Sequence, residues 1–432
     1  MINVRNDHLF IDECDCLELV AEHETPLYVI SESEIVARCN KLKSAFLNKY
    51  DNCKALYASK AFLPMAMCKI MAREGLGLDV VSGGELYTAL KAGFPTERID
   101  FSGNNKLRSE LMMAVENQIG RVVVDNLYEL FLLDNVCHEL QKPMAILMRI
   151  IPAVHTDTHK HISTGHKDSK FGIPIADGEI DGAIEFAQKS KWLSFKGFHF
   201  HVGSQLFSAE SHLNALQSTY GLLDRLRAKM GIEIEELDVG GGFGIKYLPT
   251  DQPPALEAFI DPIMASIDNY FKSKNRPRPR IVIEPGRWII GEAGLTLYTI
   301  GSTKRSASGK KYIAVDGGMS DNIRPALYQA KYHAVLANKA EQVPVETVSV
   351  AGKFCESGDI LIEDIELPEV DSGDILAVYA TGAYTYSMAS NYNKNIIPGV
   401  LLINGAEQNY IVKRQSYDDI IRNEVVPEYL ED

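Results

Sequence analysis

The longest section of the chain repeats one pattern of hydrophobic and polar positions. From about residue 54 to residue 287, short apolar runs, often β-branched, alternate with amphipathic stretches. The first five runs begin about 22 to 24 residues apart, which is enough chain for one strand and one helix. Eight runs predict strands: Ala55–Ala58, Gly77–Val81, Ile99–Ser102, Arg121–Asp125, Ala145–Ile151, Phe195–His201, Leu237–Gly240 and Arg280–Glu284.

Strands that alternate with helices form parallel sheets. Apolar residues at helical spacing in Glu85–Ala92 and Leu127–Leu140 support this alternation. Eight such units in about 230 residues predict an α/β fold, a (β/α)8 or TIM barrel. A doubly wound sheet is the alternative, and it would need fewer strands.

After Arg287 the pattern becomes that of a β-domain. Short runs between Gly, Asp and Ser turns predict strands, and we expect one helix among them, at Asp321–Lys339. We therefore expect a barrel over residues 31–287 and a mainly β C-terminal domain, a sandwich or barrel, over 288–432. N-terminal strands within residues 1–30 are expected to pack on that domain. The predicted strands outside the barrel are Asn3–Asp12, Pro26–Val29, Thr296–Thr303, Lys311–Asp316, Glu346–Ala351, Asp374–Ala380 and Val400–Asn404.

Composition excludes several classes of protein. The 432 residues are 46% hydrophobic and 24% charged, which excludes a disordered, collagen-like or coiled-coil chain. A net charge of −14 argues against binding to nucleic acid or to an anionic membrane. No apolar run approaches the ~20 residues that span a bilayer, and acidic residues near the N-terminus argue against an export signal. The seven scattered cysteines form no CxxC pair, so we expect a cytoplasmic protein.

Polar residues gather where the predicted barrel strands end. All carboxyl ends of a parallel barrel lie on one face, and that face carries the active site in such barrels. We therefore expect the site to be built there, although polar residues follow strands in many proteins. The residues concerned are Lys60, Asp79, Asn104, Asp125, His201, the glycines after Val239, and Glu284.

Two of these positions suggest specific chemistry. Lys60 follows a buried strand, where desolvation lowers the pKa of an amine and makes it nucleophilic toward carbonyl groups. Glu284 ends another strand in IVIEPGR, and an interior carboxylate needs a cationic partner such as a protonated heterocycle. Arg287 could clamp a phosphate or carboxylate, or it could simply pair with Glu284.

The glycine-rich turn Leu237–Gly244 follows a strand, and its backbone N–H groups could close on a phosphate. It fits neither GxGxxG nor a P-loop, so a purely structural turn is the alternative. The stretch FHFHVGS places His199 and His201 on one strand face, where we expect a base or a ring-stacking group rather than a metal pair. A histidine that only packs in the core is the alternative.

Three further clusters carry polar chemistry. Four histidines fit no usual zinc spacing, so we expect no metal site. FCESGD places the Cys355 thiol beside Glu356, and the thiol could act as an acid or a nucleophile. GAYTYSMASNYN, at Gly382–Asn393, offers hydroxyl and amide donors. The four histidines are His155, His159, His161 and His166.

Taken in order, these motifs make the chain similar to a known family. It resembles the bacterial diaminopimelate decarboxylases, pyridoxal 5'-phosphate enzymes of the alanine-racemase-like fold type, along nearly its whole length. The resemblance rests on YASKAF, LDVVSGGELYTALKAGFP, HISTGHKDSKFGI, HFHVGSQ, DVGGGFG, EPGR, RPALYQAKYHAV, CESGD and GAYTYSMASNYN.

The resemblance implies a role for each site residue. Lys60 would form the Schiff base with the cofactor, Glu284 would pair with its ring nitrogen, and His201 would stack on the ring. The other cofactor-binding residues would be Asp79, Ser204, Gly242, Gly286, Arg287 and Tyr384, chiefly around the phosphate. The substrate would be held by Arg287, Arg324, Tyr328, Glu356 and Tyr384.

The implied reaction is decarboxylation of meso-diaminopimelate to L-lysine. Cys355 would return the proton, and Cys355 and Glu356 would enter the site of the partner subunit in a homodimer. A sister decarboxylase acting on ornithine, lysine, arginine or a carboxylated polyamine is the main alternative. A cofactor-carrier protein, a racemase and a lysine-dependent aldolase each leave some of the motifs unexplained.

Overall fold

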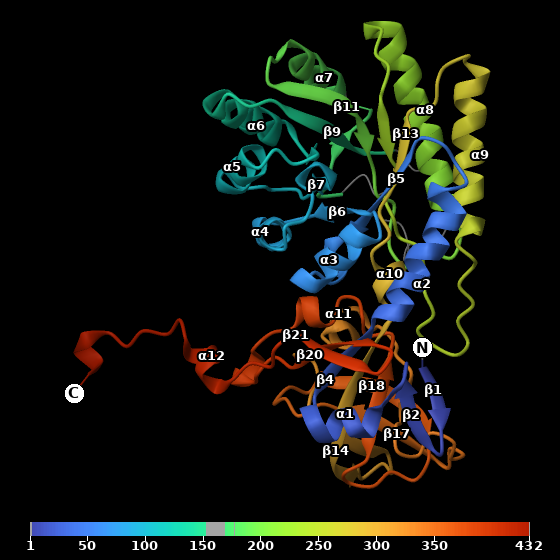
Figure 1. Ribbon diagram of the computed structural model, residues 1–432, viewed down its shortest axis with the longest axis vertical. Coiled ribbons are helices and arrows are strands. Elements are labelled where there is room, and N and C mark those ends of the chain that lie inside the picture. Colours follow the sequence, from blue (N-terminus) through green and yellow to red (C-terminus); the bar gives the residue numbers. More distant parts are fainter. Residues whose placement is uncertain (1, 153–168, 177, 432) are drawn as a thin grey trace. The chain divides into compact units, whose positions relative to one another are not determined.

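The computed structural model describes residues 2–152, 169–176 and 178–431 (Figure 1). The chain divides into two compact units. One comprises residues 38–245 and 252–289, and the other comprises residues 1–37, 246–251 and 290–432. Among the described residues, no helix is both long and apolar enough to cross a membrane.

The first unit is built on a closed ring of eight parallel strands, which confirms the predicted (β/α)8 barrel. Each strand pairs with its neighbours in the ring, and β8 pairs with β9 to close it. A short extra strand, β10 (Ile173–Pro174), pairs with β9 outside the ring. The ring strands are β5 (Cys53–Ala58), β6 (Gly77–Val80), β7 (Ile99–Phe101), β8 (Arg121–Val124), β9 (Met144–Ile151), β11 (Leu193–His199), β12 (Glu236–Asp238) and β13 (Arg280–Ile283).

Helices follow the strands along the chain, as the amphipathic spacing predicts (Figure 1). Side-chain hydrogen bonds at the N-terminal caps fix the residues at which two of the helices begin. The Ser82 hydroxyl accepts a hydrogen bond from the Glu85 N–H at 3.2 Å, and the Asn126 side chain accepts one from the Glu129 N–H at 3.0 Å. The helices are α2 (Glu32–Leu42), α3 (Met65–Arg73), α4 (Gly83–Lys91), α5 (Arg108–Glu116), α6 (Leu127–Leu140), α7 (Glu179–Lys189), α8 (Glu210–Met230), α9 (Glu257–Ser273) and α10 (Arg287–Ile290).

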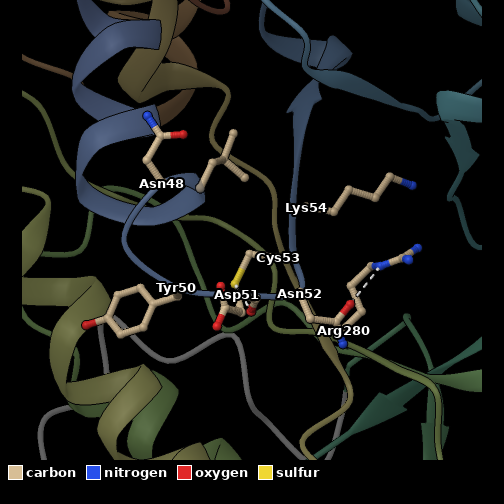
Figure 2. A pocket seen from close by; sticks show the side chains of 8 residues that line it. Asn48, Tyr50, Asp51, Asn52, Cys53, Lys54 and Arg280 are labelled. Carbon is tan, nitrogen blue, oxygen red and sulfur yellow. Dashed lines mark hydrogen bonds between the residues drawn. The ribbon is translucent and has the colours of Figure 1, made fainter.

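Buried ion pairs lie at the amino ends of the barrel strands. Arg121 donates two hydrogen bonds to Glu236, at 3.0 and 2.7 Å, and Nζ of Lys54 donates to Asp100 at 2.8 Å. A polar cleft of about 430 Å³ opens at the same end, lined in part by Cys53, Lys54 and Arg280 (Figure 2). This end of a barrel ordinarily contributes stability rather than catalysis.

The second unit is mainly β, as expected. Its largest sheet runs in the order β18-β17-β15-β14-β4-β20-β21, and β19 joins β14 to β16. The long strand β14 pairs with β4 and β19 through its first half and with β15 through its second. The strands are β4 (Leu27–Ser31), β14 (Gly294–Arg305), β15 (Lys311–Val315), β16 (Ala334–Leu336), β17 (Glu346–Ala351), β18 (Ile360–Leu367), β19 (Ile375–Tyr379), β20 (Gly399–Asn404) and β21 (Glu407–Val412).

The N-terminal segments lie in this unit. β4 enters the large sheet between β14 and β20. A three-stranded sheet precedes it, and side chains such as Leu9 and Ile11 share an apolar core with Leu295 and Leu401. The small elements are β1 (Ile2–Arg5), β2 (His8–Ile11), β3 (Cys14–Asp15) and α1 (Cys16–His23), and α12 (Tyr417–Ile421) follows β21.

The prediction of a helix at Asp321–Lys339 is wrong over most of that segment. Only α11 (Arg324–Tyr328) forms, and it ends at Gln329, whose φ of 54° is left-handed. The residues that follow instead reach β16, where Ala334–Leu336 pairs with β19. Pairing with a distant strand therefore overrides the helical spacing of this segment.

Candidate active site

The candidate site is formed at the carboxyl ends of neighbouring barrel strands. Lys60 lies in a short turn, Ser59–Ala61, directly after β5, and Asp79 lies on the adjacent strand β6. Nζ of Lys60 is 4.0 Å from Oδ2 of Asp79. Glu284 directly follows β13, which pairs with β5 on its other side. The ring topology therefore brings these three residues into one region.

The pKa values of three buried carboxyl groups here shift in different directions. Burial raises the pKa of Asp79 and that of Asp238 well above the ordinary value, and the charge of Glu284 raises both further. Burial also opposes ionisation of Glu284, but His199 and Lys60 hold its pKa below the ordinary value. The site thus favours the charged form of Glu284 over the charged forms of Asp79 and Asp238.

The two histidines of the FHFHVGS stretch have different positions. His199 ends β11 and is buried, with Nε2 at 3.3 Å from Oε1 of Glu284. His201 lies two residues beyond the strand, and its Nδ1 accepts a hydrogen bond from the Gly241 N–H at 3.3 Å. Burial lowers the pKa of both, so both rings are neutral at pH 7. His199 therefore faces the carboxylate, and His201 contacts the glycine-rich turn.

Sequence spacing offered no third ligand for a metal near these histidines, but the fold supplies a candidate. One ligand atom each from His199, Asp238 and Glu284 lies within 4.8 Å of the others. Burial raises the pKa of Asp238, which disfavours the charged form that a cation needs, and its Oδ1 already accepts the Gly240 N–H at 2.8 Å. This trio is therefore better suited to hold one carboxylate in place than to hold a cation.

The glycine-rich turn packs so closely that its glycines are required. A Cβ at Gly241 would lie 2.1 Å from the Glu284 carbonyl oxygen, and one at Gly242 would lie 2.3 Å from the Gly203 carbonyl oxygen. Gly242 also has a φ of +98°, which L-residues rarely adopt. From outside the ring, Nε2 of His212 lies 3.0 Å from the Gly241 carbonyl oxygen. The turn is therefore held in one conformation.

Four residues predicted for the phosphate come from the loops after β11, β12 and β13. Nη2 of Arg287 donates a hydrogen bond to the Ser204 hydroxyl at 3.0 Å. Gly242 packs against the segment just before Ser204, and Gly286 packs against Ala58 of β5, where a Cβ would lie 2.9 Å from the alanine Cβ. These loops place a guanidinium, a hydroxyl and tight backbone turns together.

This donor set fits pyridoxal phosphate. Lys60 supplies an amine for an aldehyde, and the buried Glu284 supplies a fixed negative charge for a protonated ring nitrogen. Both carboxyl oxygens of Asp79 are buried and accept no hydrogen bond within the described residues, so they can receive a donor from a bound group. Ser204 and Arg287 supply the polar contacts for a phosphate.

The second unit carries the predicted substrate residues. Arg324 and Tyr328 stand at the two ends of α11, four residues apart and therefore on one helix face. Arg324 is 8% exposed and Tyr328 is 61% exposed. Burial lowers the pKa of Arg324, but hydroxyl groups of two neighbouring tyrosines outweigh this and raise it. Arg324 is thus a fixed cation, and Tyr328 is an accessible ring.

The CESGD motif forms a tight turn around Asp359. The carboxylate of Asp359 accepts the Phe354 N–H at 2.9 Å and the Met319 N–H at 2.7 Å. The turn leaves Cys355 and Glu356 exposed. Asn393 of the GAYTYSMASNYN motif accepts the Cys355 N–H at 3.0 Å. Two of the sequence motifs therefore meet in this unit at Cys355.

Tyr384 has an unusual backbone conformation. Its φ is 60°, and holding a tyrosine there costs about 1–3 kcal/mol. The preceding Gly382 packs so tightly that a Cβ would lie 1.9 Å from the Ile290 carbonyl oxygen. The fold thus fixes Tyr384 in a position that the chain would not adopt unaided.

The remaining predicted residues play smaller parts. Asn104 and Asp125 follow β7 and β8, and the Asn104 carbonyl accepts the Asn126 side chain at 3.1 Å. Phe171 of the SKFG stretch receives the Arg149 guanidinium 4.4 Å from its ring centroid. The four clustered histidines lie outside the described residues: His155, His159, His161 and His166.

Sequence reasoning missed five residues that shape these sites. Asp238, Tyr332 and Asp359 lie within DVGGGFG, RPALYQAKYHAV and CESGD, where neighbouring residues received the predicted roles. His212 and Tyr247 act on residues 29 and 77 positions away in the chain. Membership in these motifs was the available signal for Asp238, Tyr332 and Asp359. The missed residues are His212, Asp238, Tyr247, Tyr332 and Asp359.

Comparison with known proteins identifies the class first. A family model described as "Pyridoxal-dependent decarboxylase, pyridoxal binding domain" matches residues 32–291. The chain is 46% identical to diaminopimelate decarboxylase of Bacillus subtilis over 418 residues, covering 97% of this chain and 95% of that protein. It is 47% identical to the Bacillus methanolicus protein of the same name over 408 residues, covering 94% of each.

Solved structures agree. The structure of diaminopimelate decarboxylase from M. jannaschii in complex with L-lysine superposes with a TM-score of 0.93 at 35% identity, covering 99% of this chain and 98% of that one. The fold and the strand-end residues define a pyridoxal-dependent decarboxylase. Within that class, the chain belongs to the diaminopimelate decarboxylase family.

Proposed function

We propose that this protein decarboxylates meso-2,6-diaminopimelate to L-lysine and CO₂, the last step of lysine biosynthesis. The observation that carries the proposal is the buried Glu284 carboxylate beside His199, in the same barrel mouth as Lys60. Identity of 46% to a relative of that name along nearly the full chain supports the substrate.

The cofactor chemistry is supplied by pyridoxal phosphate, whose protonated ring withdraws the electron pair left at the α-carbon when CO₂ departs. Glu284 keeps the ring nitrogen protonated, and His199 holds the Glu284 carboxylate in place. Lys60 supplies the amine for cofactor attachment, near Asp79. His201 would stack on the ring, and its Nδ1 accepts the Gly241 N–H.

We assign the phosphate to the loops that follow three barrel strands. Ser204 and Arg287 bind it with their side chains, and Gly242 and Gly286 bind it through the backbone. Tyr384 completes this set. Because the glycine turn is packed against strand ends, the phosphate site costs little reorganisation when the cofactor binds.

The distal end of the substrate carries both a carboxylate and an ammonium group. Arg287, Arg324 and Tyr328 hold the carboxylate, with Tyr384 beside them, and Glu356 holds the ammonium group. The buried cationic Arg324 supports this assignment. A site for ornithine or lysine would not need paired arginines, because those substrates lack a second carboxylate.

Cys355 returns a proton to the α-carbon after CO₂ leaves. Its exposure fits a role in the active site of a partner subunit, which makes the working unit a homodimer that shares its sites through Cys355 and Glu356. We assign cofactor binding to residues 31–287, the β-domain to 288–432, and its supporting strands to 1–30. We also propose that the reaction takes place in the cytoplasm.

A substrate panel tests the function. Purified protein loaded with pyridoxal phosphate would be given meso-diaminopimelate, its LL isomer, L-lysine, L-ornithine and L-arginine, with CO₂ and amine product measured. Turnover of the meso isomer alone, with L-lysine as product, supports the proposal. Preferred turnover of ornithine, lysine or arginine would leave the cofactor chemistry intact and overturn the distal-site assignment.

A further inference from the structure

One nitrogen of the Arg324 guanidinium, Nη1, donates hydrogen bonds to the hydroxyl groups of two tyrosines. Nη1 donates a hydrogen bond to Oη of Tyr247 at 2.7 Å and another to Oη of Tyr332 at 2.9 Å. The two rings meet edge to face, with centroids 5.3 Å apart. The guanidinium carbon lies 5.2 Å from the Tyr247 centroid and 5.9 Å from the Tyr332 centroid. Arg324 is thus held within an aromatic corner.

Two other nitrogen atoms of the guanidinium, Nε and Nη2, remain able to donate hydrogen bonds to a ligand. Across residues 2–152, 169–176 and 178–431, the Arg324 side chain donates hydrogen bonds only through Nη1 and forms no ion pair with a carboxylate. Arg324 is nevertheless buried, with only 8% of its surface exposed. A buried cation needs an anionic partner. The Nε and Nη2 groups can therefore meet a carboxylate that is not part of the chain.

The choice of neutral acceptors matters. A carboxylate in place of either tyrosine would fix Arg324 equally well, but it would also neutralise the charge needed for an anionic ligand. A phenol oxygen fixes the guanidinium and leaves its net charge available. Tyr332 is 2% exposed, so its ring is also locked by packing.

We propose that Tyr247 and Tyr332 are positioning residues that set the affinity for the distal carboxylate of the substrate by holding Arg324 through Nη1. This rests on the proposed function, which places that carboxylate at Arg324. Neither tyrosine touches the reacting carbon in this assignment. Loss of either hydroxyl should therefore weaken binding of the carboxylate and leave the chemical step unchanged.

The test uses Tyr332→Phe and Tyr247→Phe in the holoenzyme, because each keeps the ring and removes only the hydroxyl group that accepts the Arg324 hydrogen bond. Tyr312→Phe, in β15 of the same unit, is the matched control. KM and kcat are measured with meso-diaminopimelate, and binding is measured with L-lysine and with 1,5-diaminopentane through the absorbance of the bound cofactor. L-Lysine keeps the distal carboxylate, and the diamine lacks it.

We expect each tyrosine variant to weaken L-lysine binding and raise KM by about tenfold. Binding of the diamine and kcat should stay within about twofold of the parent, and Tyr312→Phe should behave like the parent. Equal loss of both ligands, a fall in kcat at constant KM, or unchanged L-lysine binding would overturn the inference. Tyr247→Phe, at a half-buried position, carries the test if Tyr332→Phe fails to fold.

Failure of the proposed function gives a different result. In that case the parent protein would not convert meso-diaminopimelate, whatever the tyrosine variants do. The positioning role alone can also fail. In that case the parent converts the meso isomer normally, and the tyrosine variants prefer L-lysine over the diamine as strongly as the parent does.

Discussion

Nε2 of His199 lies 3.3 Å from Oε1 of Glu284, and both side chains are buried at the mouth of the barrel. Strand pairing produces this contact, because His199 on β11 is paired with Asp238 on β12, and Asp238 is paired with Val282 on β13. A neutral imidazole at this distance stabilises a carboxylate without cancelling its charge. The pair therefore favours a charged Glu284 inside the barrel.

Glu284→Gln tests whether that charge drives the reaction. The amide keeps the size of the side chain but cannot hold a ring nitrogen protonated. We expect kcat to fall by about 100-fold or more, with cofactor still bound. Steady-state kinetics and cofactor absorbance check this.

Glu235→Gln is the control, because the exposed Glu235 precedes β12 at the far end of the ring and pairs with the half-buried Lys196. It should behave like the parent protein. A Glu284→Gln variant with near-parental kcat would exclude an electronic role for Glu284.

Lys60→Ala should abolish turnover, because no other lysine in the described part of the chain lies within 4.0 Å of Asp79. It should also remove the visible absorbance band of the lysine-linked cofactor. Absorbance spectroscopy and a CO₂ assay measure both effects. Lys69→Ala, on α3, serves as the matched control. Near-normal turnover of Lys60→Ala would show that Lys60 is not the attachment site.

Cys355→Ala should slow product formation, because the variant lacks the thiol that we assign to return the proton. The cofactor should stay bound, because Cys355 lies on the exposed turn around Asp359 and not among the residues assigned to the cofactor. Mixing this variant with Lys60→Ala tests the shared site. If each site combines Lys60 of one subunit with Cys355 of the other, subunit exchange restores part of the activity. Release of cofactor from Cys355→Ala, or no recovery after demonstrated exchange, would argue against these roles.

The barrel and most of its candidate site could be predicted from sequence, because both follow local rules. Each predicted barrel run overlaps a strand, and the polar residues at the run ends reach one face through ring topology. What sequence could not supply are pairings across long separations. The segment after Tyr328 has helical spacing, yet it forms β16 because β19 offers a partner. Likewise, nothing local links Tyr247 to Arg324, which lies 77 positions along the chain.

Arg121→Ala should destabilise the barrel without altering its chemistry. It would leave Glu236 buried without its bidentate partner, at the end of the ring opposite Lys60. Removing one partner of a buried pair costs about 3–5 kcal/mol. Urea unfolding measures the loss, and kcat of the folded protein should be unchanged.

Arg280→Ala is the comparison, since Arg280 is more exposed and lies 3.4 Å from Glu236. Its cost should be below about 1 kcal/mol, as for other exposed pairs. Equal costs for the two variants would show that the Arg121 pair is not the dominant ion pair at this end.

His212 should make stability depend on pH. Burial lowers its pKa from 6.5 to about 4, so the folded protein keeps the ring neutral while an unfolded chain would protonate it below pH 6.5. The unfolded state then binds more protons, and stability falls as pH drops from 6.5 to 4, by up to about 3 kcal/mol. His212→Gln should flatten that slope in urea unfolding at pH 7 and pH 5. His138→Gln, at an exposed position on α6, should retain the parental slope, and an unchanged slope in His212→Gln would place its origin elsewhere.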